Sequence, residues 1–95
     1  MTKTIEMTPG SASAYYNRGL AEVKTGRFDD AVRDFSKAIE IQPEASAFFN
    51  RGIARVHLRL YEQAILDFEK AAAQDPAFKS KSVDQIDYCR KRLRK

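Results

Sequence analysis

The chain contains one segment twice, at an offset of 33 residues. Residues 15–45 align with residues 48–78 without a gap, and 11 of the 31 aligned pairs are identical. The longest identical run, Asn-Arg-Gly at 17–19, returns at 50–52. Repetition at a fixed period of a few tens of residues is typical of proteins that stack copies of one structural unit. The sequence therefore predicts a repeat architecture and not a fold built around one reaction centre.

Each copy carries two segments in which apolar residues recur at helical rather than alternating spacing. The predicted helices cover residues 12–25, 28–42, 47–59 and 61–74. Gly26 follows the first helix in a position suited to a left-handed conformation, and Pro43 and Pro76 follow the second and the fourth. Because the connections are short, each helix has to pack antiparallel on its neighbour. The expected fold class is all-α.

A fifth helix is expected after the second copy. Residues 82–85, Ser-Val-Asp-Gln, have the form of a capping box, which marks a helix N-terminus. Four residues then fall on one apolar face: Val83, Ile86, Cys89 and Leu93. Residues 79–95 contain seven Lys or Arg and two Asp, so the net charge of +4 is concentrated there. We interpret residues 79–95 as a basic capping helix.

The N-terminal residues carry a fainter echo of the repeat. Residues 4–9 resemble residues 38–43, where the second helix of the first copy ends. Residues 1–11 are therefore either part of a preceding repeat or a disordered lead-in. The sequence leaves open whether the chain is complete or excised from a longer array.

The repeated positions resemble the tetratricopeptide repeat, a helix–turn–helix of about 34 residues with an aromatic residue, a glycine, an Ala-x3-Phe pair and a closing proline. The first copy supplies Tyr15, Gly19, Ala31, Phe35, Ala38 and Pro43, and the second Phe48, Gly52, Ala64, Phe68, Ala71 and Pro76. The resemblance implies two repeats, at residues 12–44 and 45–78, and then the capping helix. It also implies a right-handed α-α superhelix of about five helices.

The two copies differ at their internal turns. Arg59 stands where the first copy has Gly26, so we expect the second turn to be less relaxed. Gly19 and Ala31 are small, as helices that approach closely require, whereas Phe35 is large and fills the space between successive pairs.

Arginines occupy two positions where the family often has leucine. Arg18 can pair with Glu22 on the next turn, and Arg51 can reach Glu22 from the following repeat. Exposed pairs of this kind contribute only about 0–1 kcal/mol. Asp34 and Asp67 are expected to lie on solvated faces.

In the family, the first helix of each repeat lines a concave groove. Carried over residue by residue, this groove comprises Ser13, Tyr16, Asn17, Leu20, Val23, Lys24, Ser46, Phe49, Asn50, Ile53, Val56 and His57. The stripe is mostly apolar, and its two asparagines can bond both the donor and the acceptor of a peptide backbone. The resemblance implies a scaffold or adaptor that binds a partner protein, a peptide or a second copy of itself. Self-association is included because soluble monomers seldom expose such a patch.

One subclass of the family binds the acidic C-termini of chaperones through a clamp of Lys, Asn, Asn, Lys and Arg. Asn50 matches one clamp position, but Tyr16 and Leu20 stand where Lys and Asn are required. The sequence therefore argues against this ligand.

The sequence contains no pattern typical of an enzyme. His57 is the only histidine, and it is interpreted as a groove residue. Cys89 lies on the apolar side of its helix and is interpreted as a small core residue. A glycine-rich phosphate loop, a nucleophile elbow and a zinc spacing are all absent. We expect no catalysis, no cofactor and no metal.

The basic C-terminus allows three interpretations. It is a solvated helix end, a short basic address or a site for nucleic acid. The residues concerned are Arg90, Lys91, Arg92, Arg94 and Lys95. Clustered cations can neutralise phosphates, but Tyr88 alone is available for base stacking, so specific base recognition is not expected.

Two features indicate location. A single cysteine cannot form an internal disulfide, which favours a reducing compartment. The chain has neither a run of about 18 apolar residues nor the apolar core of a secretory signal. We expect an intracellular, cytoplasmic protein.

Overall fold

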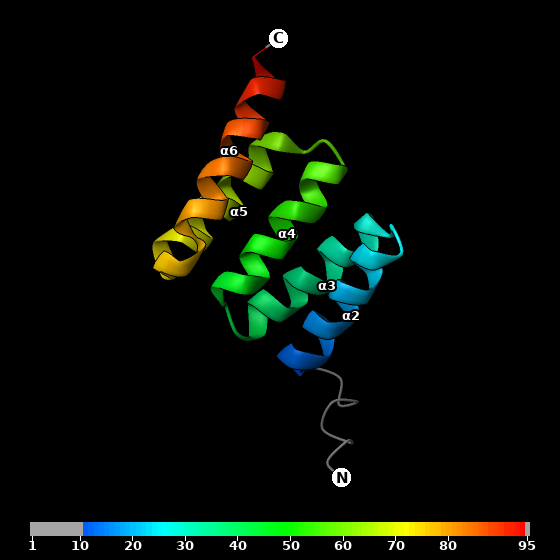
Figure 1. Cartoon of the computed structure of the whole chain (residues 1–95). Coiled ribbons are helices and arrows are strands. Elements are labelled where there is room, and N and C mark those ends of the chain that lie inside the picture. Colours follow the sequence, from blue (N-terminus) through cyan, green and yellow to red (C-terminus); the bar gives the residue numbers. More distant parts are fainter. Residues whose placement is uncertain (1–10, 95) are drawn as a thin grey trace.

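A computed structural model describes residues 11–94 of the chain. Within this range five α-helices follow one another: α2 (Ala12–Lys24), α3 (Phe28–Ile41), α4 (Ala45–His57), α5 (Tyr61–Gln74) and α6 (Lys79–Leu93). A short 3-10 turn, Pro76–Phe78, precedes α6. Figure 1 shows two helical hairpins stacked next to each other, with α6 packed on α5. The predicted all-α, α-α superhelical arrangement is confirmed. The echo predicted at residues 4–9 lies outside the described residues.

Each helix packs mainly on the helices next to it in the chain. The most extensive contacts join α2 to α3 and α4 to α5, followed by α5 with α6 and α3 with α4. Contacts between α2 and α4 are few. This is the pattern of a stack in which hairpins are added in sequence, and it leaves one face of α2 and α4 without a covering helix.

In each hairpin, a glycine of the first helix lies in close contact with a phenylalanine of the second. A Cβ atom at Gly19 would lie 2.7 Å from Cε1 of Phe35, and one at Gly52 would lie 2.7 Å from Cε1 of Phe68. Both phenylalanine rings are fully buried. The glycines are therefore required because the aromatic ring of the second helix occupies the space of a side chain on the first.

The two internal turns have the same backbone shape. Gly26 has φ 81° and Arg59 has φ 65°, both in the left-handed region. Glycine adopts this region freely, whereas an L-residue with a side chain is disfavoured there by about 1 kcal/mol. The expectation that the second turn is less relaxed is thus confirmed.

Helix α4 begins earlier in the sequence than predicted. It begins at Ala45, not at residue 47, and it ends at His57. Ala45 is buried and packs with Phe48 and Ala71. This tertiary contact explains the additional helical residues.

The last helix begins at Lys79, three residues before the predicted cap, so the capping-box prediction is wrong. The chain is instead turned by Asp75, whose Oδ1 accepts a hydrogen bond from the Ala77 amide at 3.0 Å. Ser82 lies inside the helix and is fully buried. The capping-box pattern failed because the helix had already started from the preceding 3-10 turn.

The apolar face of α6 is also only partly as predicted. Cys89 is fully buried, and Ile86 packs in the same core, as expected. Val83 and Leu93 are exposed. The buried positions are Ser82 and Cys89, two turns apart, because these small residues allow α6 to lie closely on α5.

Both predictions about the buried charges are wrong. Asp34 and Asp67 are buried rather than solvated. Arg51 donates to Asp67 of its own repeat, at 2.8 and 3.1 Å, rather than to Glu22. Arg18 donates to Asp34 in the same two-pronged way, at 2.7 and 2.8 Å. A carboxylate in this position needs such a partner because an unpaired buried charge is costly.

Candidate functional site

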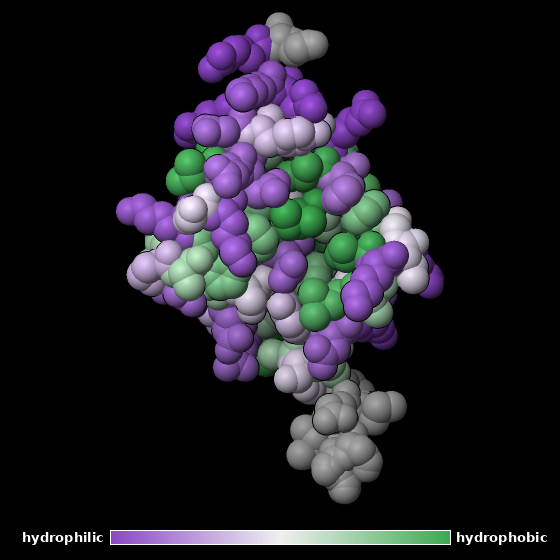
Figure 2. Space-filling model, in the orientation of Figure 1, coloured by the Kyte–Doolittle hydropathy of each residue, from purple (hydrophilic) through white to green (hydrophobic). Residues whose placement is uncertain are grey.

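The predicted apolar stripe is half-buried on both helices. On α2, the side chains of Tyr16, Leu20 and Val23 pack around the core of Ala31, Phe35 and Ala54. On α4, those of Phe49, Ile53 and Val56 pack around the core of Ala64, Phe68 and Cys89. Each stripe residue therefore has one side fixed in the core and keeps some surface accessible. Figure 2 shows apolar side chains gathered in the middle of one face, with hydrophilic ones around them.

The two asparagines of the stripe are not equivalent. Nδ2 of Asn50 donates to the hydroxyl of Tyr16 at 3.0 Å and to the carbonyl of Ser46 at 2.9 Å. Both amide protons of Asn50 are used, so it offers a partner only its carbonyl oxygen. Asn17 is exposed and keeps its side chain accessible. The bond from Asn50 to Tyr16 also joins the two repeats across the stripe.

The two basic residues of the predicted set lie at one end of the stripe. Lys24 is the last residue of α2, and His57 is the last residue of α4. The imidazole of His57 stacks on the ring of Phe28, with centroids 4.3 Å apart and planes 2° from parallel. The orientation of His57 is thus set by a residue of the preceding repeat, although the side chain is exposed.

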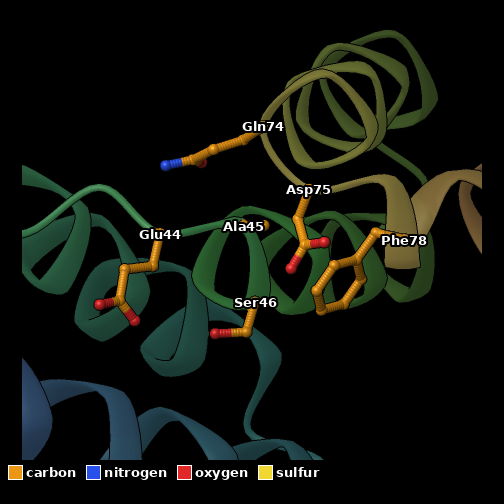
Figure 3. Close-up of a pocket in the computed structure, with 6 residues that line it drawn as sticks. All are labelled: Glu44, Ala45, Ser46, Gln74, Asp75 and Phe78. Carbon is orange, nitrogen blue, oxygen red and sulfur yellow. The ribbon is translucent and has the colours of Figure 1, made fainter.

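A hollow of about 350 Å³ lies at the N-terminal end of α4. Figure 3 shows its six lining residues: Glu44, Ala45, Ser46, Gln74, Asp75 and Phe78. The carboxylate of Asp75 accepts the Ala77 amide, and the amide of Gln74 donates to the carbonyl of Pro43 at 2.7 Å. The ammonium of Lys81 lies 5.2 Å from the ring centroid of Phe78. This end of the stripe is therefore polar, with two carboxylates and one neighbouring cation.

A larger hollow, about 590 Å³, lies at the C-terminal end of α4. We call it the basic hollow, and it is lined by Val56, His57, Arg59, Tyr61, Tyr88 and Arg92. The guanidinium of Arg92 lies 4.3 Å from the ring centroid of Tyr88. The rings of Tyr88 and Tyr61 meet edge to face at 6.4 Å.

Arg59 and Tyr61 were not predicted as site residues, and Tyr88 and Arg92 were assigned only to the basic C-terminus. The structure brings them to the groove because α6 packs on α5 as α4 packs on α3. A sequence signal existed, since the small residues Ser82 and Cys89 follow Ala47 and Ala54 at an offset of 35. All four are buried in the structure. At that offset, Arg92 corresponds to His57.

The pKa values of Glu22 and Cys89 are both raised, mainly by burial. Burial, and then the neighbouring carboxylates of Asp34 and Asp30, raise the pKa of Glu22 to about 7. Burial raises the pKa of the Cys89 thiol, which makes it a poor nucleophile. Cys89 is thus a core residue, as predicted. Among residues 11–94, no cluster of three His, Cys, Asp or Glu side chains could hold a metal ion.

Comparison with known proteins gives two findings about the repeats. Models of the tetratricopeptide repeat match residues 12–44 and residues 45–78. The chain is also similar to a protein from Oryza sativa subsp. japonica described as Protein SGT1 homolog, with 43% identity over 42 residues. That segment covers 44% of this chain and 11% of the rice protein, so the similarity concerns a small part of the relative. Among the helices that the structure describes, none is both long and apolar enough to cross a membrane.

Proposed function

The chain belongs to the tetratricopeptide repeat family, and we propose that it is a non-catalytic adaptor that binds an extended peptide of a partner protein in its groove. The family is one of protein-interaction modules. The observation that carries the proposal is the half-buried apolar stripe on α2 and α4. Its side chains are held by the core on one side and keep accessible surface on the other.

The stripe has the properties that a preformed peptide site needs. Because the aromatic and aliphatic side chains are already packed, a ligand loses little free energy in ordering them. Asn17 and the carbonyl of Asn50 supply polar groups that can meet a peptide backbone. The ligand would lie across α2 and α4 and bury the accessible surface of Tyr16, Leu20 and Phe49.

A random peptide library displayed on phage tests this proposal. Selected peptides are added to isotope-labelled protein, and the amide shifts are followed by NMR. We expect the largest changes on α2 and α4. Amide shifts confined to α3 and α5, on the other side of each hairpin, would contradict the proposal.

Matched variants separate the groove from the back of the repeats. Asn17→Ala with Asn50→Ala removes the polar groups of the groove, and Lys37→Ala with Lys70→Ala removes equivalent exposed residues of α3 and α5. We expect the first pair to weaken peptide binding about tenfold, the effect of losing one to two hydrogen bonds. The second pair should leave binding unchanged.

A second copy of the chain is the other ligand that the sequence suggested for the groove. Sedimentation over a range of concentrations distinguishes the two, because a dimer closed by the groove would compete with the selected peptides. A nucleic-acid role of the basic C-terminus and an intracellular, cytoplasmic location stay predictions from the sequence.

A further inference from the structure

We propose that the basic hollow at the C-terminal end of α4 is a subsite for an anionic group, a carboxylate or a phosphate, carried by the partner peptide. This inference rests on the groove function proposed above and deepens it by naming the chemistry of one end of the ligand. The site combines residues of the second repeat with residues of α6.

Three basic residues line the basic hollow: His57, Arg59 and Arg92. Within residues 11–94, no carboxylate lies within 4.0 Å of the charged groups of Arg59 or Arg92, whereas Arg18, Arg51 and Arg55 are all paired with aspartates. The hollow therefore has uncompensated positive charge. A planar guanidinium matches the geometry of a carboxylate or phosphate, so two such groups in one hollow favour an anion.

Aromatic contacts hold two of these side chains, His57 and Arg92, in place. His57 stacks on Phe28, and Arg92 lies over the ring of Tyr88, which in turn meets Tyr61. Side chains that are already positioned lose less conformational freedom when a ligand arrives. The hydroxyl groups of Tyr61 and Tyr88 add donors that suit the same kind of ligand.

Arg59 occupies a backbone position where glycine has the lower energy. Its φ of 65° lies in the same left-handed region as the 81° of Gly26 in the first repeat, and Arg59 is one of the residues that line the hollow. A strained residue at a candidate site is an observation from which function can be inferred. The side chain of Arg59 gives the second repeat a charge that a glycine cannot supply.

The surroundings of the hollow select a peptide rather than a nucleic acid. Val56 joins the hollow to the apolar stripe, and the opposite end of the stripe carries Glu44 and Asp75. A ligand with an apolar segment and one anionic end fits this arrangement in a single direction. A nucleic acid instead needs a track of cations that follows several phosphates, and here the cations meet at one point.

Two carboxylates are next to residues of the hollow in the sequence. Glu62 follows Tyr61, and Asp87 precedes Tyr88, and both side chains are exposed. Neither forms an ion pair with Arg59 or Arg92 within the described part of the chain. The hollow is therefore not neutralised by the acidic residues next to it in sequence.

The first test uses simple anions and needs no peptide. Inorganic phosphate and acetate are titrated into the isotope-labelled full chain, and the signals of the His57 ring and the arginine side chains are followed by NMR. We expect saturable shifts of His57, Arg59 and Arg92. Shifts spread evenly over all exposed arginines would overturn the proposal, because they indicate diffuse charge.

The second test compares two variants with the same loss of charge. Arg59→Gly with Arg92→Gln removes the guanidinium groups of the hollow, and Arg90→Gln with Arg94→Gln removes two exposed cations of the C-terminal end that do not line it. Arg59→Gly keeps the turn, since Gly26 occupies the same conformation. We expect the first variant to lower anion affinity about ten- to a hundredfold and the second to change it less than threefold. Equal losses would contradict a specific site.

The third test separates the subsite from the groove. Groove-selected peptides are made with a terminal Glu pair, a phosphoserine or a neutral Gln-Ser ending, and a single-stranded oligonucleotide is included. Tighter binding of either anionic form, lost in the Arg59→Gly and Arg92→Gln variant, supports the proposal and distinguishes the carboxylate from the phosphate. Equal affinity for all three endings would refute the subsite but leave the groove function intact. Preferred binding of the oligonucleotide, lost on changing Arg90 and Arg94, would refute it in favour of nucleic acid.

Discussion

In the first repeat, the side chain of Arg18 remains 64% exposed while it binds Asp34, whereas the equivalent Arg51 of the second repeat is 16% exposed and binds Asp67. The pairs have the same sequence spacing and the same two-pronged geometry. They differ in their neighbours, because the second repeat lies between α3 and α6. The same ion pair therefore contributes differently to stability in the two repeats, because its burial differs.

The residue one helical turn after Arg18 and after Arg51 makes the two ion pairs more different. The first repeat has Glu22 there, which places two carboxyl groups beside one guanidinium. The second repeat has Arg55, which donates to Asp67 at 2.9 Å and so places two guanidinium groups around one carboxylate. Arg51 also donates to Ser36 of the first repeat at 3.0 Å. The second cluster therefore ties the repeats together, and the first does not.

The largest effect is expected from removing the central carboxylate. Asp67→Asn leaves Arg51 and Arg55 enclosed without a counter-charge, which should lower the free energy of unfolding by about 3–5 kcal/mol. Asp34→Asn leaves the exposed Arg18 in contact with water and should cost about 1 kcal/mol or less. Urea unfolding followed by circular dichroism measures both. Equal costs in the two variants would show that the position in the stack is unimportant.

The two glycine–phenylalanine contacts should contribute equally to stability, although the two ion pairs do not. Gly19→Ala and Gly52→Ala each place a Cβ 2.7 Å from a buried phenylalanine ring. Because the ring must move, each should lose about 1–3 kcal/mol of stability, by similar amounts. The same unfolding measurement applies. A cost at Gly52 several times larger than that at Gly19 would mean that the packing of the repeats also differs.

The residues with positive φ in the two turns can be exchanged by mutation. Arg59→Gly relieves the left-handed arginine and should raise stability by about 0.5–1 kcal/mol, whereas Gly26→Arg should lower it by a similar amount. Thermal unfolding of both variants tests this. Arg90→Ala, in α6, is the control for loss of an exposed arginine. Destabilisation by Arg59→Gly would indicate that the arginine side chain itself supports the fold.

The effect expected at Glu22 differs in kind from the others, because it depends on pH. The pKa of this carboxyl is raised from its usual 4.5 to about 7, so the folded state keeps a proton that the unfolded state loses in between. The contribution of Glu22 to stability should therefore fall as the pH rises from about 5 to 7. Glu22→Gln should flatten this slope, and Glu40→Gln, an exposed residue of α3, should not. A slope that survives in Glu22→Gln would assign it to another group.

The groove could be predicted in part. Tyr16, Leu20, Phe49 and Ile53 lie together because helical spacing places them on one face of each first helix. The hydrogen bonds of Asn50 were not predictable, since they depend on the hydroxyl of Tyr16 in the other repeat. Residues of the basic hollow were missed for a related reason. They come from α4, α5, the turn between these two helices, and α6. The period of 33 residues does not extend to α6, which is shifted by the turn at Pro76–Phe78.

The sequence alone determined the hairpin and its duplication. Helical spacing, the closing prolines, and the glycine and phenylalanine positions are local signals that recur at the same offset, whereas the turn glycine is present in the first copy alone. Tertiary structure alone decided which aspartates are buried, where α6 begins, and that His57, Arg59 and Arg92 share one hollow. The physical reason is that burial and charge pairing depend on what the neighbouring helices cover. Identical residues such as Arg18 and Arg51 therefore acquire different surroundings.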